Sequence, residues 1–136
     1  MPARSKARKR AVDVLFEADL RERPAPEVLA ELIHRTNHPL NPYVTELVTG
    51  VAAHQSRIDD LLATYSEGWP LGRMPVVDRS ILRIGTWELL WGDVPDAVVQ
   101  SEAAELASSL STEESASFVN GLLAKIIEVR PHLVLG

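Results

Sequence analysis

Residues 74–91 read MPVVDRSILRIGTWELLW, and this stretch decides the fold class of the chain. Pro75 suits the first turn of a helix, where its missing N–H costs nothing, and the next proline is Pro95. At helical spacing, apolar side chains cover about half of the circumference or more. A helix this apolar must be surrounded by other helices. We therefore predict a central helix over residues 75–91 of an all-α bundle.

Two carboxylates interrupt this apolar surface. Asp78 lies at the edge of the apolar arc and Glu88 near its middle. A buried carboxylate needs a partner, because burying an unpaired charge is costly. Each of the two is therefore either paired inside the protein or available to a binding partner.

Charge is distributed unevenly along the 136 residues. The first ten carry five basic side chains and no acid, whereas the remaining 126 residues carry 9 basic and 19 acidic side chains, a formal charge of −10. A basic end on an acidic body predicts a localised site for a polyanion such as nucleic acid; a solvated basic tail is the alternative. The five basic residues are Arg4, Lys6, Arg8, Lys9 and Arg10.

The basic segment is expected to continue directly into a first helix over roughly residues 3–22. Ala7, Ala11 and Ala18 recur at helical spacing, and the segment ends before Pro24. Phe16 falls on the opposite side of this helix. Either the helix is packed on two sides, or Phe16 is a surface ring beside cations, a combination that stacks bases.

Proline-marked breaks and apolar stripes predict further helices on both sides of the central one. A second helix follows Pro26, and Asn41 with Pro42 opens a third. Ser56 to Asp59 resembles a capping box, which predicts that a fourth helix starts there. Two more helices follow the central one, and nothing alternates as a strand would. The sequence thus predicts about seven helices in a single domain over residues 1–136.

The pair Asn120-Gly121 is unusual within the last predicted helix. Glycine costs about 1 kcal/mol relative to alanine in a helix interior. Such a glycine can admit close approach by another backbone, and Asn120 could then bond something at that face. Helix packing alone is the other interpretation.

Recognisable catalytic chemistry is absent from the sequence. It has no cysteine, no glycine-rich phosphate loop and no nucleophile elbow. His34 and His38 stand four residues apart, but no acid lies near them in sequence and Pro39 follows, so we expect no metal site and no cofactor. No apolar run is long enough to span a bilayer, and no signal peptide is recognisable. We expect a soluble, cytoplasmic binding protein and no enzyme.

Several segments, in this order, resemble the NusB family of bacterial transcription antitermination factors. They are RKRAVDVLF (8–16), VDRSILRIGTWEL (77–89), EAAELA (102–107) and FVNGLL (118–123). The resemblance implies a fold of two small helical subdomains and a pairing with NusE, a small ribosomal-subunit protein. In the family the pair binds the boxA element of nascent RNA, especially from ribosomal RNA operons, and helps RNA polymerase resist termination.

The resemblance also implies roles by position. The basic residues from Arg4 to Arg10 would form the RNA side with Phe16, Asn120 and Gly121. The partner side would hold Asp78, Arg83 and Phe118. Glu88 is a further candidate for this side on account of its place in the apolar arc, and Asp78 is expected to pair with a cation of NusE.

The chain departs from the family pattern at three positions. Phe16 stands where the family often has tyrosine, Trp87 where it usually has tyrosine, and Ser101 where it commonly has asparagine. A purely protein-binding helical adaptor with a solvated basic tail is the alternative function. A homodimer is also open, since an exposed apolar residue such as Trp91 could serve either a dimer interface or the NusE face.

Overall fold

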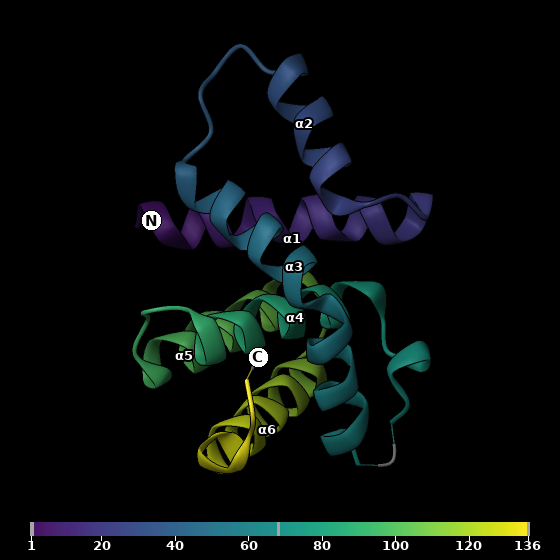
Figure 1. The fold of residues 1–136 in the computed structure, drawn as a ribbon, viewed down its shortest axis with the longest axis vertical. Coiled ribbons are helices and arrows are strands. Elements are labelled where there is room, and N and C mark those ends of the chain that lie inside the picture. Colours follow the sequence, from purple (N-terminus) through teal and green to yellow (C-terminus); the bar gives the residue numbers. More distant parts are fainter. Residues whose placement is uncertain (1, 68, 136) are drawn as a thin grey trace.

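The computed structural model describes residues 2–67 and 69–135, whose regular structure is entirely helical (Figure 1). This confirms the all-α prediction. Two short 3-10 helices, η1 (Leu71–Arg73) and η2 (Arg130–His132), accompany the six α-helices. These are α1 (Ala3–Arg21), α2 (Ala25–Arg35), α3 (Pro42–Tyr65), α4 (Val76–Trp91), α5 (Asp96–Leu110) and α6 (Glu113–Val129).

The predicted central helix is α4. It packs against α1, α3, α5 and α6. Every residue from Ser80 to Leu89 is buried, as the wide apolar arc of the sequence requires. A helix surrounded in this way fixes the relative positions of its four neighbours.

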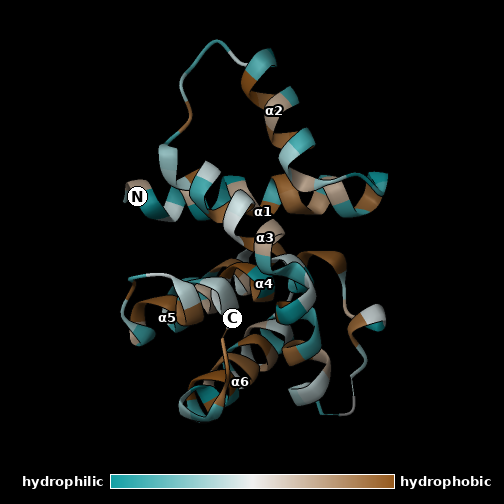
Figure 2. Cartoon of the chain, viewed as in Figure 1, coloured by the Kyte–Doolittle hydropathy of each residue, from teal (hydrophilic) through white to brown (hydrophobic). Residues whose placement is uncertain are grey.

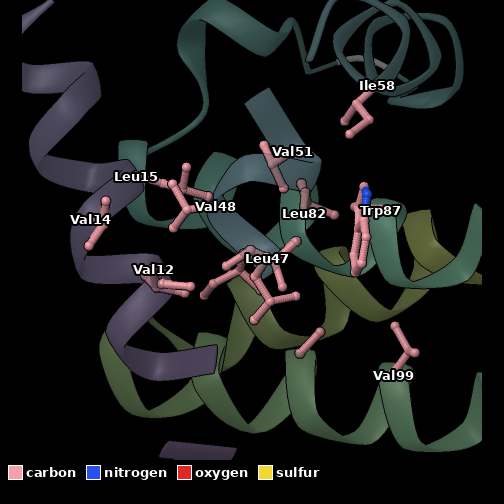
Figure 3. Close-up of a cluster of buried hydrophobic side chains, with 14 of the residues drawn as sticks. Val12, Val14, Leu15, Leu47, Val48, Val51, Ile58, Leu82, Trp87 and Val99 are labelled. Atoms are coloured by element: carbon pink, nitrogen blue, oxygen red, sulfur yellow. The ribbon is translucent and has the colours of Figure 1, made fainter. Parts of the chain in front are cut away.

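The helices form two groups connected by α3. Figure 1 shows α1, α2 and the first half of α3 in one group, and α4, α5, α6 and the second half of α3 in the other. Hydrophobic and hydrophilic residues are interspersed along α2 (Figure 2), and its Val28 and Leu29 are buried. Figure 3 shows Val12 and Leu15 of α1 beside Leu47 and Val48 of α3, all four buried.

The prediction of separate third and fourth helices is wrong, because α3 is continuous from Pro42 to Tyr65. Ser56 lies inside the helix instead of capping one. The apolar stripe repeats every seven residues through Val44, Val51 and Ile58, so one helix buries it without a break. The sequence between Gly50 and Gly68 also contains no glycine or proline that would end a helix.

We expect two helical glycines to respond oppositely to replacement by alanine. A Cβ atom on Gly50 would overlap the indole ring of Trp87, whereas one on Gly121 would meet no atom within 4 Å. Gly50→Ala should lower the free energy of unfolding by about 1 to 3 kcal/mol, because the core is overpacked. Gly121→Ala should raise it by up to about 1 kcal/mol, because alanine favours the helix. Urea unfolding measures both, and equal effects would contradict the close approach of α3 and α4.

Candidate nucleic-acid interface

Four of the five N-terminal basic residues are exposed on α1: Arg4, Lys6, Lys9 and Arg10. Lys9 forms an exposed ion pair with Asp13 at 3.2 Å, and Arg4 lies 3.5 Å from Asp93. In the residues that the structure describes, Lys6 and Arg10 have no ion-pair partner. Their positive charges are therefore available to an anionic ligand.

Arg8 does not belong to this exposed set, which corrects its prediction as an RNA contact. Its side chain is buried, with Nε 3.1 and 3.0 Å from the two carboxylate oxygens of Glu88 and Nη2 at 2.9 Å. Nη1 lies 3.5 Å from Oε1 of Glu102. Arg8 precedes Val12 by four residues and Leu15 by seven, so it occupies the buried side of α1.

Tyr43 completes the buried cluster around Glu88. Its hydroxyl donates a hydrogen bond to Glu88 Oε2. Burial, and then the bond to this carboxylate, raise the pKa of Tyr43 well above its ordinary value. Burial by itself lowers the pKa of Arg8, but the hydrogen bonds and charge of Glu88 outweigh it and the pKa is raised. The Arg8 guanidinium thus stays charged beside Glu88 inside the protein.

These contacts hold the N-terminal half of α1, which has weak helix-end signals of its own. Pro2 provides no side-chain cap, the first turn has no acid, and cations oppose the helix dipole at this end. Ser5 donates a hydrogen bond to Glu102, and the Arg4 guanidinium lies 4.3 Å from the centre of the Tyr43 ring. The exposed cations are therefore presented on an ordered helix and not on a disordered tail.

Two grooves flank this half of α1. One, of about 250 Å³, lies between α1 and residues 39–44 and is lined by Lys6 and Arg10 but by no acid. The other, of about 590 Å³, lies between α1 and α5 and contains Glu102 and Glu105 beside Lys6 and Lys9. Phosphates are favoured in the first groove, because acids in the second repel them.

Phe16 is half-buried on α1. The helix packs against α2, α3 and α4, which agrees with the interpretation that it is packed on two sides. Within the described part of the chain, Phe16 is not among the half-buried apolar residues that pack on the main core. Base stacking by Phe16 therefore stays a prediction.

Three of the four predicted partner-binding residues are buried and bond to residues of the same chain, which corrects their prediction as a docking surface. Asp78 is fully buried and accepts a hydrogen bond from Ser115 at 2.7 Å. Glu88 pairs with Arg8, as described above. Arg83 binds both carboxylate oxygens of Asp59, at 2.9 and 3.0 Å, and Asp19 at 2.8 Å. Burial raises the free energy of a lone charge, and Glu88 and Arg83 are each neutralised by a partner within the bundle. Asp78 has no ion pair among the described residues, and its buried Oδ1 has no hydrogen-bond partner there.

The fourth, Phe118, lies on α6 beside the predicted RNA contacts Asn120 and Gly121. It lines an open groove of about 310 Å³ with Gly121, and its ring meets Trp69 edge-on at 4.6 Å. Gly121 faces open space and Asn120 is exposed. The interpretation that another helix packs on this glycine is therefore wrong. Helix α4 packs against both α1 and α6, and Figure 1 shows α6 on the other side of α4 from α1.

Trp91 is not the exposed apolar residue that the sequence predicted. It is half-buried, and its ring stacks on that of His54 with centroids 3.9 Å apart and planes 13° from parallel. This stack connects α3 to the end of α4, so Trp91 has a partner inside the chain.

The fold and the exposed cations together define a class: an all-helical binding protein with a surface suited to a polyanion. Within residues 2–67 and 69–135, no helix is long and apolar enough to cross a membrane. The chain belongs to the NusB family, whose family model matches residues 5–128. This membership confirms both the family resemblance and the prediction of a binding protein that is not an enzyme.

Known proteins of this family are similar over nearly the whole chain. The transcription antitermination protein NusB of Arthrobacter sp. (strain FB24) is 56% identical over 135 residues, covering 98% of this chain and 99% of the relative. T. maritima NusB is 34% identical, with a TM-score of 0.82 over 94% of this chain and 92% of that one. NusB in a crystal structure with NusE and dsRNA is 27% identical, with a TM-score of 0.83 over 95% of this chain and 98% of that one.

Proposed function

We propose that residues 1–136 act as a single domain in transcription antitermination. In this proposal the chain pairs with NusE, binds boxA-type RNA of nascent ribosomal RNA transcripts, and helps RNA polymerase resist termination in the cytoplasm. The chain's membership of the NusB family supports this, as does the solved complex of a similar NusB with NusE and dsRNA.

One observation carries the RNA-binding part of the proposal. Lys6 and Arg10 lie exposed on an ordered helix, line the same acid-free groove and have no ion-pair partner among the described residues. Phosphate oxygens are the ligands that such cations favour, and releasing counterions from RNA then adds to affinity. The acidic remainder of the chain disfavours RNA elsewhere.

Fluorescence anisotropy with a labelled boxA-type RNA tests the proposal, with and without NusE. Affinity should fall steeply as salt is raised, and a scrambled RNA should bind more weakly when NusE is present. If no RNA binds with or without NusE, the chain is instead a protein-binding adaptor. If boxA-type and scrambled RNA bind equally with NusE, the boxA specificity is wrong.

We expect Phe118→Ala to weaken NusE binding by about tenfold, since buried aromatic residues carry much of the energy of protein interfaces. Isothermal titration of NusE into the variant measures this. Phe16→Ala is the matched control, because it removes the same ring from α1, away from the α6 groove. Equal losses in the two variants, or none in Phe118→Ala, would contradict NusE contact at Phe118. A urea melt separates a binding loss from the loss of the packing of Phe118 on Trp69.

A further inference from the structure

The groove between α1 and α5 has a composition that phosphate binding does not explain. At about 590 Å³ it is larger than the acid-free groove on the other side of the helix. Lys6 and Lys9 line one wall and Glu105 and Leu106 the other. Its size falls in the range of sites that take a small ligand, of about 300 to 1,000 Å³.

The two acids of this groove are used differently. Glu102 is half-buried and already accepts a hydrogen bond from Ser5 and pairs with Arg8. Glu105 is exposed and, in the part of the chain that the structure describes, has neither an ion pair nor a side-chain hydrogen bond. A carboxylate beside an RNA-binding helix repels phosphate, so Glu105 weakens non-specific RNA binding unless it contacts a base.

We infer that this groove takes one unpaired guanine of the bound RNA, with Glu105 accepting hydrogen bonds from its Watson–Crick edge. An ionised carboxylate accepts hydrogen bonds and donates none. Guanine presents two adjacent N–H donors on that edge, whereas adenine, cytosine and uracil place an acceptor next to each donor. Bases of single-stranded RNA are commonly recognised on this edge.

The other lining residues fit a nucleotide in this orientation. Leu106 provides an apolar surface for the face of the base, and the side chain of Lys6 lines both this groove and the phosphate-favouring one. The RNA backbone would cross α1 at Lys6 while one base turns toward α5. The inference rests on the proposed RNA-binding function and assigns Glu105 as the residue that selects the base.

A set of RNAs that differ by a single amino group tests this. In a boxA-type RNA, each guanine in turn is replaced by inosine, which lacks the exocyclic amino group. Anisotropy in the presence of NusE should show one position at which this replacement weakens binding to the unaltered protein by about tenfold. Glu105→Gln should remove that difference. Glu114→Gln is the matched control, because it makes the same charge change at an exposed position on α6 and should keep the difference.

The outcomes separate this inference from the proposed function. If Glu105→Gln strengthens binding to every RNA equally and the inosine effect stays, Glu105 only repels phosphate and the inference is wrong. If no guanine position is sensitive while boxA-type RNA still binds, the inference fails and the proposed function stands. If the unaltered protein with NusE binds no RNA, the proposed function itself fails.

Discussion

Reversing the charge of Lys6 and Arg10 together should reduce RNA affinity by about 100-fold near 0.1 M salt, since each change removes an attraction to phosphate and adds a repulsion. Both side chains are exposed and line the acid-free groove, so neither change leaves a buried group unpaired. The dependence of affinity on salt should also become shallower, by about 0.7 to 0.9 for each phosphate that the variant no longer neutralises. Fluorescence anisotropy across a sodium chloride series measures both effects.

A second double variant, Arg57→Glu with Arg73→Glu, makes the same change of net charge away from the groove. Arg57 lies on α3 and Arg73 on η1. If this control weakens RNA binding as much as the first variant, the total charge of the protein determines affinity, and the groove on α1 has no special role. Circular dichroism melts should show that both variants remain folded.

Replacing Glu88 with alanine should lower the free energy of unfolding by about 3 to 5 kcal/mol, because it leaves the Arg8 guanidinium buried without its main partner. That loss is a large fraction of the total for a small domain, about 5 to 15 kcal/mol. The Tyr43 hydroxyl loses its acceptor in the same variant. Urea unfolding monitored by circular dichroism measures the change.

The chain contains a matched ion pair on its surface. Arg130 binds both oxygens of Asp96 at 2.8 Å, and the two side chains are 34% and 38% exposed. The Arg8 and Glu88 side chains are 4% and 2% exposed. Asp96→Ala should therefore cost less than about 1 kcal/mol, because solvent screens an exposed pair. Equal losses of unfolding free energy in Asp96→Ala and Glu88→Ala would contradict the burial of the Arg8–Glu88 pair.

Local patterns in the sequence predicted the helices well. The apolar arc of residues 75–91 identified the helix that contacts four others, because its circumference left no side for solvent. The four-residue capping motif at Ser56 predicts a break, but the seven-residue apolar repeat through Val51 and Ile58 runs across it, and α3 follows the repeat.

The candidate site was less predictable than the helices, because its buried charged residues bond to residues far away in the sequence. Glu88 lies 80 residues from Arg8, and Asp78 lies 37 residues from Ser115. Helical spacing showed that the two acids needed partners, but it could not distinguish a partner in the same chain from one in another protein. Arg8 was detectable in part, since it shares the side of α1 that holds Val12 and Leu15. Gly121 is the reverse case. The sequence suggested that another helix could pack on it, but the structure leaves this glycine uncovered.

The attachment of α1 through Glu88 and Glu102 has a consequence for synthesis on the ribosome. Helix α1 is made before its carboxylate partners Glu88 and Glu102, which lie on α4 and α5, 80 and more residues later in the chain. Contacts this distant in sequence form only after the intervening chain is available. The proposed RNA-binding end of the protein is therefore translated before α4 and α5, so a chain still being made exposes the basic segment before these contacts can form.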